Sequence, residues 1–533
     1  MKKTFLSISI LVIMGIVNCA IAQTMVDHGY CGSEGDGTNL AWAFTNDGML
    51  TISGSGNMAN YDYWEYPLGA EDAPWHNYIP QMKRLKIEEG VASIGNAAFF
   101  KCVAFTDSLI IPNSVKTIGD VAFGYCSSFN SLKIPNSVTT IGAYAFIHCK
   151  GFTGGLTIPN SVTEIGHDAF YYCSGFKGDL TIPNSIAIIR PNTFLGCSGF
   201  NGHLTIPNTV TQIESYAFAY CTGFTDNLII PNSLTRIGEG LFAYCDNAFT
   251  GDLIIPDAIT EIGTSAFHNC TGFNGSLTIP NSVTTIKGTA FFGCSNLSGN
   301  LIIPNSVTYI GNATFSGCRN LTGNLLIPNS VTLIGHDAFC NCSGFTGNLI
   351  IPNSITSIEK NSFSGCRGFN GVLSIPHTVT SIDDYAFKDC SMLNSVTNYN
   401  LEPVAINANV FENVNISAMK LKVDTSAIPA YKQAKVWQDF IIGSLGINES
   451  QITNYELRVY PNPTTGELRI ENGEWRINEV EIFDVHGKMQ KAESRKQKAE
   501  GETLINISNL ANGIYFLKIK TNNGVITKKV VKQ

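Results

Sequence analysis

The sequence predicts a repeat solenoid, mostly β with short helical turns, followed by a small C-terminal all-β sandwich. A string of the kind LTIPNSVTEIGHDAFYYCSGFKGD, at residues 156–179, returns about every 24 residues through the middle of the chain. The same apolar residue types recur at fixed places in every copy. From about Gln451 the repeat gives way to alternating apolar segments with Gly and Asn turns, a pattern typical of antiparallel strands. A chain of 533 residues is long for one ordinary core, but a solenoid adds its core linearly.

Residues 1–22 have the features of a Sec signal peptide. Lys2 and Lys3 form a positive start, an apolar stretch follows, and residues 20–22 read Ala-Ile-Ala, a small-x-small cleavage site. The apolar stretch is shorter than the roughly 20 residues that a membrane span needs. We therefore expect export with cleavage after Ala22, and no transmembrane span later in the chain. Lipidation at Cys19 is a weaker alternative, because Asn18 is an unusual neighbour for a lipidated cysteine.

Residues 23–84 precede the repeats and are expected to form a β-rich cap. The segments LAWAF and MLTISG flank TNDG, which predicts a hairpin. A cap is needed because the first repeat would otherwise expose its interior to water.

Residues 85–393 contain thirteen repeats. With the proline of IPNS as position zero, the prolines lie 24 residues apart except for intervals of 23 before Pro135 and 25 before Pro256, and Glu88 takes the proline's place in the first unit. Position 6 is always Ile, position 11 always Phe and position 14 always Cys. A residue fixed in every unit must meet the same environment each time, so we expect these side chains to stack as buried ladders. Representative members are Ile165, Phe170, Cys173, Ile310, Phe315 and Cys318.

Each unit predicts the same order of local structures. L-x-I alternates apolar and variable residues, as a short strand does, and Pro-Asn suits the centre of a tight turn. V-x-x-I gives a second short apolar segment, and A-F-x-x-C has helical spacing but is long enough for one turn only. A single unit cannot bury its apolar side alone, so the array is expected to fold cooperatively.

The repeat pattern L-x-I-P-x-x-V-x-x-I-G-x-x-A-F-x-x-C, with Phe or Leu three residues after the Cys, resembles the BspA-like, or Treponema-type, leucine-rich repeat of bacterial surface proteins. The resemblance spans residues 85–393 and implies a solenoid of the leucine-rich-repeat type with a parallel sheet on one face. Most units carry one extra residue before the strand, where this chain departs from the family pattern. Residues 394–450 keep a decayed repeat, PVAINANVFENV, and then SAIPAYKQAKVWQDF, for which we expect a short capping helix.

Residues 451–533 are predicted to form the β-sandwich. Its hallmark segments resemble the C-terminal sorting domain of the Bacteroidetes type IX (Por) secretion system. The resemblance implies handling by the type IX secretion machinery, removal of the domain, and attachment at the outer-membrane surface; a generic fibronectin- or Ig-like sandwich is the alternative. The residues that carry the resemblance are Tyr460, Pro461, Asn462, Pro463, Gly466, Lys528 and Lys529.

Sixteen cysteines in an exported protein would ordinarily suggest disulfides. Thirteen of them occupy the fixed repeat position, however, and neighbouring Cβ atoms in a ladder would stay about 5 Å apart, beyond the usual ~3.5–4.5 Å of a disulfide. No histidines recur at matching positions to make a metal ladder, and in the CNC pair the first member, Cys340, lies outside the pattern. We therefore expect small, buried, apolar thiols.

The middle residue of L-x-I points away from the buried Leu and Ile. From Ile229 onward this position is largely apolar, which gives two interpretations. One is a binding strip for protein or glycan; the other is that β-branched residues suit strands and that the next layer of loops covers them. The candidate strip consists of Ile229, Ile254, Ile302, Leu326 and Ile350.

Other positions give no sign of catalysis. His167 and His336 recur beside Asp in IGHDAF, but other units have Asn, Ala or Thr there, so we interpret the position as variable and exposed. Charged residues replace the glycine after the fixed Ile in five units, which indicates that this position also faces water. The sequence contains no nucleophile-elbow, Walker or zincin motif, and we expect no catalytic, metal or cofactor site. The five charged replacements are Arg190, Glu214, Lys287, Glu359 and Asp383.

Composition limits the function further. Net charge is −8 and the repeats lack a dense Lys/Arg run, so we expect no nucleic-acid partner. No segment outside the array is large enough and free for a catalytic domain, so we do not expect an enzyme. The favoured function is an exported, cell-surface, adhesin-like binding module for host protein, glycan or other bacteria. The alternative is a structural spacer or surface-layer component without a specific ligand.

Overall fold

The computed structural model describes residues 23–61, 72–445 and most of 458–532. The chain divides into two compact units, Met1–Ser444 and Leu445–Gln533. The predicted signal peptide, residues 1–22, lies outside the described residues. Within the part that is described, no helix combines the length and the apolarity needed to cross a membrane.

The first unit begins with the predicted hairpin. Strands β1 (Met25–Tyr30), β2 (Leu40–Thr45) and β3 (Met49–Gly54) pair antiparallel in chain order. Strand β3 then pairs in parallel with β5 (Arg84–Ile87), with Leu50 opposite Leu85. Because β5 is the first repeat strand, the hairpin continues the sheet of the repeats and covers its first edge.

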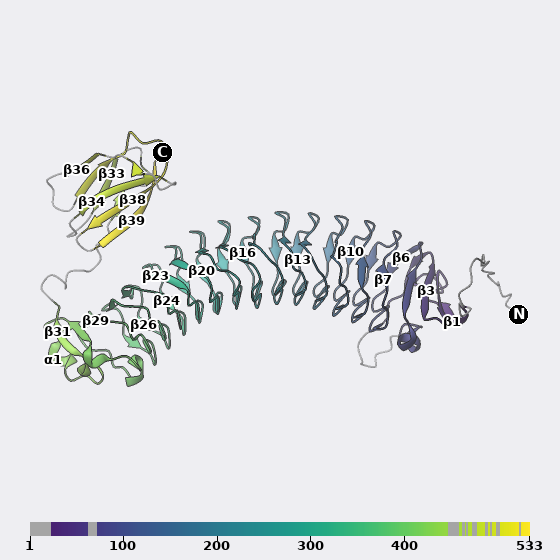
Figure 1. Ribbon diagram of the computed structural model, residues 1–533, viewed down its shortest axis with the longest axis horizontal. Helices are drawn as coiled ribbons and strands as arrows, with labels where there is room; N and C mark the ends of the chain where they lie inside the picture. Colours follow the sequence, from purple (N-terminus) through teal and green to yellow (C-terminus); the bar gives the residue numbers. More distant parts are fainter. Residues whose placement is uncertain are drawn as a thin grey trace, which may run out of the picture. The chain divides into compact units, whose positions relative to one another are not determined.

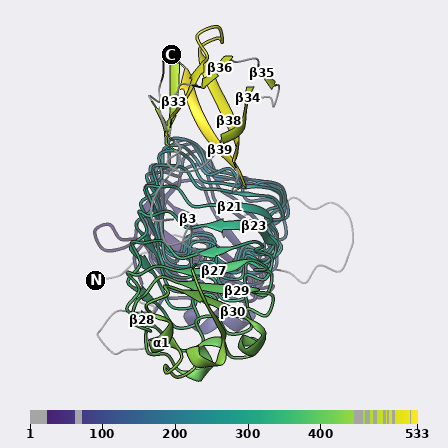
Figure 2. The same cartoon turned by 90° about the vertical axis from the view of Figure 1, so that its left-hand side faces the viewer.

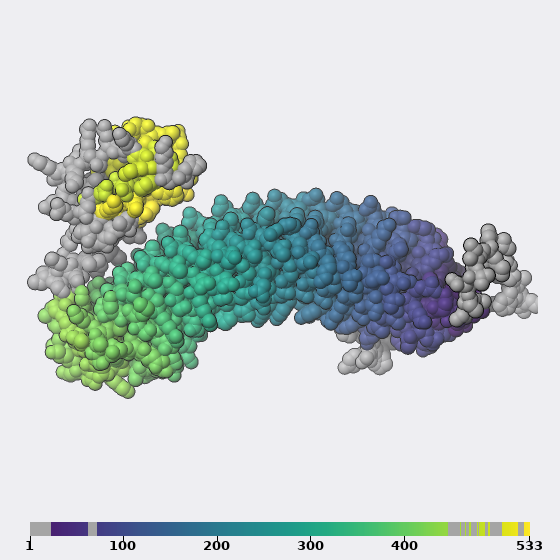
Figure 3. All heavy atoms as spheres, in the orientation of Figure 1, coloured from purple at the N-terminus to yellow at the C-terminus, as the bar shows by residue number. Residues whose placement is uncertain are grey.

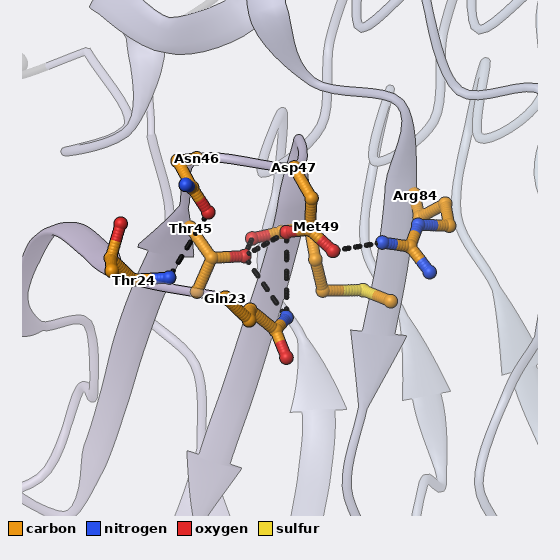
Figure 4. A network of polar contacts seen from close by, with 7 residues as sticks. All are labelled: Gln23, Thr24, Thr45, Asn46, Asp47, Met49 and Arg84. Atoms are coloured by element: carbon orange, nitrogen blue, oxygen red, sulfur yellow. Dashed lines mark hydrogen bonds and ion pairs between the residues drawn. The ribbon is translucent and has the colours of Figure 1, made fainter. Parts of the chain in front are cut away.

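Polar contacts fix the start of this hairpin (Figure 4). The amide nitrogen Nε2 of Gln23 donates hydrogen bonds to Thr45 Oγ1 at 3.3 Å and to Asp47 Oδ1 at 3.4 Å. Asp47 also forms an ion pair with Arg84 of β5. The residue that directly follows the predicted cleavage site is therefore tied to the hairpin turn, and through Asp47 to the first repeat strand.

Each coil contributes short strands that pair in parallel with those of neighbouring coils (Figure 1). Figure 2 shows β21, β23, β27, β29 and β30 of the first series lying one beneath another. The first series, built from L-x-I and its decayed copies, comprises β5, β7 (Ser108–Ile110), β9 (Ser131–Lys133), β12 (Leu180–Thr181), β14 (Leu204–Thr205), β17 (Leu253–Ile254), β19 (Leu277–Thr278), β21 (Gly299–Ile302), β23 (Leu321–Leu326), β25 (Leu349–Ile350), β27 (Val372–Ile375), β29 (Ser395–Asn398), β30 (Lys420–Val423) and β31 (Ile441–Ser444).

Apart from its first member, which comes from the cap, each strand of the second series ends at the fixed Ile of its unit. Parallel pairing places Ile141 opposite Ile165 and Ile286 opposite Ile310, so identical residues face each other. The series comprises β4 (Gly56–Asn57), β6 (Val91–Ile94), β8 (Thr117–Ile118), β10 (Thr140–Ile141), β11 (Glu164–Ile165), β13 (Ile188–Ile189), β15 (Gln212–Ile213), β16 (Arg236–Ile237), β18 (Glu261–Ile262), β20 (Thr285–Ile286), β22 (Tyr309–Ile310), β24 (Leu333–Ile334), β26 (Ser357–Ile358) and β28 (Ser381–Ile382).

The fixed residues stack as columns inside the coils, which confirms the predicted ladders. Ring centroids of Phe170 and Phe194 lie 5.4 Å apart with an angle of 2° between the planes, and those of Phe291 and Phe315 lie 5.3 Å apart. Burial of each such side chain contributes about 1.5–3 kcal/mol. The representative ladder members Ile165, Phe170, Cys173, Ile310, Phe315 and Cys318 are all buried.

The predicted helical turn at A-F-x-x-C is wrong. Asp168 and Tyr172 have φ values of 57° and 53°, which a right-handed helix excludes. The N–H of Phe170 donates to Thr193 O of the next coil at 2.9 Å, while the N–H of Cys173 closes a tight turn to Phe170 O at 3.0 Å. Alternate N–H groups therefore bind the neighbouring coil, and this ladder replaces the intrahelical hydrogen bonds that one isolated turn could not sustain.

Aromatic residues close both ends of the coil stack. Trp75, next to the 3-10 helix η1 (His76–Gln81), stacks on Phe99, and Trp437 of η4 (Trp437–Asp439) packs against Phe411. The predicted C-terminal capping helix is a single turn, α1 (Ile428–Tyr431). The 3-10 helices η2 (Ala408–Phe411) and η3 (Ile416–Ala418) complete this end.

The second unit consists of two antiparallel sheets around one core, as the sequence predicts for a sandwich. Leu468, Ile470 and Ile505 from one sheet and Leu517 and Ile519 from the other are buried together. The first sheet has the order β32 (Arg458–Tyr460), β33 (Glu467–Glu471), β37 (Glu502–Asn506), β36 (Glu493–Lys496), and the second β35 (Met489–Gln490), β34 (Ile477–Asp484), β38 (Gly513–Thr521), β39 (Gly524–Lys532).

Candidate binding surface

The middle residues of the first strand series form a row of exposed apolar side chains, which we call the apolar strip. Leu301 and Ile303 face the core and are 2% and 6% exposed, so Ile302 between them must point outward and is 71% exposed. Parallel pairing sets Ile302 beside Leu326 of the next coil. The members are Ile229 (73% exposed), Ile254 (58%), Ile302 (71%), Leu326 (67%) and Ile350 (51%).

These exposures decide one point that the sequence left open. The interpretation in which a further layer of loops covers the row is wrong, because each of the five side chains is at least half exposed. The coils are packed side by side on the face drawn in Figure 3. Thr278 stands in the row between Ile254 and Ile302 and interrupts its apolar character.

Rows of Asn and Asp flank the apolar strip on both sides. One row lies two residues before each strip residue, on the same face of the strand, and the other follows the proline. In the first row Asp252 Oδ1 accepts the N–H of Ser276 at 2.6 Å, so these side chains also link successive coils. An apolar centre with a polar rim is the usual composition of a protein interface. The exposed members are Asn227, Asp252, Asn300, Asn324 and Asn348 in the first row and Asn232, Asp257, Asn305 and Asn329 in the second.

A charged hollow lies beside the second strand series. Its volume is about 440 Å³, and its lining includes Arg190, which replaces the glycine after the fixed Ile. The Arg190 guanidinium lies 4.0 Å from Glu214 Oε1 of the next coil, and His167 Nδ1 lies 2.9 Å from Asp168 Oδ2. The remaining charged lining residues are Asp120 and Glu164.

A second cluster occupies the same repeat positions seven coils further on. His336, Glu359 and Asp383 come from three successive coils, and one potential ligand atom of each lies within 4.8 Å of the others. The sequence indicates each residue singly but does not bring the three together, since successive members are about 24 residues apart. The signal was present: a His after the glycine in one unit is followed by acidic replacements of that glycine in the next two units.

A row of stacked aromatic side chains on the turns was also not predicted from the sequence. Tyr220 and Tyr244 stack at 4.6 Å, His268 lies 4.8 Å from Tyr244, and Phe292 stacks on His268 at 4.6 Å. Partial burial in this row lowers the pKa of His268. A sequence signal exists in the aromatic residues at positions 12 and 13 of successive units.

The ladder cysteines are buried thiols, as predicted. The fifteen cysteines that the structure describes are all free, and the thirteen in the ladder are buried. The Cys173 thiol donates to Phe146 O of the preceding coil at 3.0 Å, and Cys342 donates to Phe315 O at 3.0 Å. Burial raises the pKa of Cys294 to about 12. These thiols are therefore protonated packing groups and poor nucleophiles.

The residues of the predicted sorting signal are described only in part. Tyr460 ends β32, and Lys528 and Lys529 lie in β39, whereas Pro461, Asn462, Pro463 and Gly466 lie outside the described residues. The backbone N–H of Thr464 donates to Val531 O at 2.9 Å. This bond holds Thr464 against the end of β39, within the closing KKVVK sequence.

The comparisons with known families assign both units. Residues 77–177, 176–298, 246–370 and 322–434 match the family described as BspA type Leucine rich repeat region (6 copies). The chain belongs to this BspA-type leucine-rich-repeat family. Residues 458–533 match the Secretion system C-terminal sorting domain. This BspA-type protein is therefore a cell-surface repeat protein, whose sorting domain indicates type IX secretion to the cell surface or the extracellular space.

A solved structure agrees with the fold. A leucine-rich repeat protein from Bacteroides ovatus is 28% identical, with a TM-score of 0.57, and the match covers 72% of this chain and 98% of that one. A leucine-rich repeat protein from Eubacterium ventriosum is 20% identical, with a TM-score of 0.41, over 81% of this chain and 97% of that one. No curated protein matches the chain. The matched families and structures are leucine-rich-repeat proteins, and no catalytic family is indicated.

Proposed function

We propose that the repeat unit is an adhesin-like binding module, which holds a partner of the host or of another bacterium through the apolar strip. The observation that carries the proposal is the row Ile229 to Ile350, exposed by half or more and bordered by Asn and Asp. Scattered surface apolar residues are ordinary, but an exposed apolar row with a polar rim, interrupted here at Thr278, is typical of an interaction site. The apolar centre favours a protein surface over a glycan.

Magnitudes support a contact of moderate strength. Full burial of one large aliphatic side chain contributes about 1.5–3 kcal/mol. The five strip residues are 51–73% exposed, so together they supply at most roughly 8–15 kcal/mol before costs. Association costs an estimated 4–15 kcal/mol in lost freedom. The strip therefore needs help from hydrogen bonds of the polar rim, or from several copies of the protein on one cell surface.

The test uses the mature protein on an array of extracellular-matrix proteins and glycans. In one variant Ile302, Leu326 and Ile350 are changed to Ser; in the matched control Thr157, Thr181 and Thr205, at the same repeat position, are changed to Ser. We expect the first variant to lose binding to protein ligands and the control to keep it. Unchanged binding of the first variant to every ligand of the parent would refute the strip, and loss of glycan binding alone would identify a saccharide partner.

The regular coil spacing also fits a structural spacer, in which length alone matters. Deletion of three whole internal units, residues 277–348, separates the two functions, because the flanking coils can rejoin in register. A spacer would lose reach gradually, whereas the binding module would lose its ligand when Ile302 and Leu326 are removed. Deletion of the three units at residues 132–203, outside the apolar strip, is the matched control.

A further inference from the structure

Three side chains with metal-binding chemistry converge on the surface of the second strand series. Glu359 and Asp383 directly follow the fixed Ile358 and Ile382, which pair in parallel register, so the two carboxylates lie one coil apart on the same row. His336 belongs to the coil before them. Its Nδ1 lies 3.4 Å from Glu359 Oε2, and an Asp383 oxygen completes a triangle within 4.8 Å.

The surrounding contacts orient this cluster. The Ser357 hydroxyl donates to Glu359 Oε1 at 2.6 Å, which leaves Oε2 directed toward His336. The backbone N–H of His336 donates to Asn312 Oδ1 at 3.0 Å. This hydrogen bond holds the His336 backbone against the preceding coil. The Glu359 side chain is 20% exposed, so its carboxylate is held at the surface with restricted freedom. Fixed supporting hydrogen bonds of this kind orient ligands in known metal sites.

The same chain contains a matched cluster with different chemistry. His167, Arg190 and Glu214 occupy the repeat positions of His336, Glu359 and Asp383. There the Arg190 guanidinium supplies a positive charge beside Glu214.

In the second cluster Glu359 stands in the place of Arg190, so two carboxylates share the row. Lys360 borders the same hollow as Asp383, but among the described ion pairs it contacts neither carboxylate. Neighbouring like charges are unfavourable unless a cation lies between them.

We propose that His336, Glu359 and Asp383 bind a divalent transition-metal ion, Zn²⁺ being the best match. Zn²⁺ takes His nitrogen and carboxylate oxygen, whereas Ca²⁺ and Mg²⁺ prefer all-oxygen sites. Tetrahedral bonds of about 2.0–2.2 Å place two ligand atoms roughly 3.3–3.6 Å apart, and the His336–Glu359 separation is 3.4 Å. Asp383 is exposed, so rotation of its side chain would bring a carboxylate oxygen to the same separation. The fourth position is open to water or to a group on another molecule.

The test is calorimetric titration of the metal-free, tag-free mature protein with ZnCl₂. We expect binding at one site that weakens at least about tenfold in His336→Ala and in Glu359→Gln, since even supporting residues of metal sites contribute about 10–100-fold. His167→Ala and Glu214→Gln, at the matched positions of the first cluster, should leave the affinity unchanged. Equal Zn²⁺ affinity of the parent, His336→Ala and Glu359→Gln proteins, or no binding by the parent, would overturn the proposal.

A second measurement identifies the ligands without relying on affinity. Co²⁺ bound to nitrogen and oxygen gives visible absorption bands, whereas thiolate ligation adds an intense near-ultraviolet band. We expect the first spectrum, and its loss in Glu359→Arg, which copies Arg190 into the second cluster. Thiolate absorption would assign the ion to the half-buried Cys340 and refute the site. Circular dichroism identical to the parent's shows that each variant is folded.

Discussion

The indole of Trp75 stacks on the ring of Phe99, with centroids 5.4 Å apart and 15° between the planes. Its Nε1–H donates to Ala98 O at 2.9 Å, so the ring is held by a hydrogen bond as well as by contact. Phe99 begins the column of fixed phenylalanines. At the opposite end Trp437 meets Phe411 edge-on at 5.9 Å. The column thus ends on a tryptophan at both sides, where a bare phenylalanine would face water.

Replacement of Trp75 by Ala should therefore destabilise the N-terminal coils. A fully buried Trp changed to Ala costs about 3–5 kcal/mol through lost contacts and a cavity, and the buried Ala98 carbonyl also loses its donor. Urea unfolding followed by circular dichroism gives the free energy, and hydrogen exchange should show the loss concentrated near Phe99. Leu401→Ala, at a residue 60% exposed, is the control and should change stability by less than about 0.5 kcal/mol.

Two adjacent residues test which way the strand faces. Ile303→Ala removes a core side chain that is 6% exposed and should cost about 2–5 kcal/mol. Ile302→Ala removes a side chain that is 71% exposed and should cost below about 1 kcal/mol, mainly through lower strand preference. Chemical denaturation of the two variants measures the difference. Similar costs at the two positions would mean that the strip side chain is covered.

The thiol ladder should remain reduced in the exported protein. Mature protein unfolded in guanidinium without reductant should show fifteen reactive thiols, matching the fifteen free cysteines described. The folded protein should react slowly and first at Cys340, which is only half-buried. Fewer than four thiols in the unfolded sample would show that ladder cysteines pair as disulfides, contrary to the structure.

Stability should fall steeply in alkali because the ladder thiols are buried. Desolvation raises the pKa of Cys294 and of Cys390 from 9.0 to about 12 in the folded protein. The stabilising contribution is therefore complete below pH 9 and is lost as pH rises toward 12, since unfolded thiols ionise first. Within this window, each thiol lowers the free energy of unfolding by about 1.4 kcal/mol for every pH unit of increase.

A variant with fewer ladder thiols isolates this effect from other alkaline titrations. Cys221, Cys245 and Cys270, all changed to Ala, remove three ionisable groups from the middle of the ladder. Urea unfolding at pH 8, 9 and 10 should give a shallower decline for this variant, although its stability at pH 8 is lower. Parallel declines for the two proteins would show that ladder ionisation does not drive alkaline unfolding.

The core of the repeats could be predicted from the sequence, because a residue that recurs at the same position of every unit has the same burial in each unit. Once Phe170 is assigned to the interior, every equivalent Phe follows, and the structure places them in one column. The conformation at A-F-x-x-C could not be predicted in this way. Its spacing suits a helix, and only the stacked neighbours supply the carbonyls that bind alternate N–H groups, as Thr193 does for Phe170.

Of the two candidate sites, one could be predicted from the sequence and the other could not. The outward direction of Ile302 follows from strand alternation within one unit, so the sequence sufficed for it. The cluster of His336, Glu359 and Asp383 arises between units, and it depends on parallel register that brings residues about 24 positions apart into contact. The sequence can predict such neighbours only once the number of residues in each coil and the register between coils are known.

Removal of residues 458–533 should stop surface delivery without unfolding the repeats. The sorting domain matches that segment, and its core residues, among them Leu468 and Leu517, belong to a cluster separate from the core of the coils. With an epitope tag placed after Gln23, antibody should stain intact cells that make the full chain. Cells that make the truncated chain should stain only after lysis, while the purified repeats keep the unfolding midpoint of the parent. Surface staining of the truncated chain would show that export does not need the sorting domain.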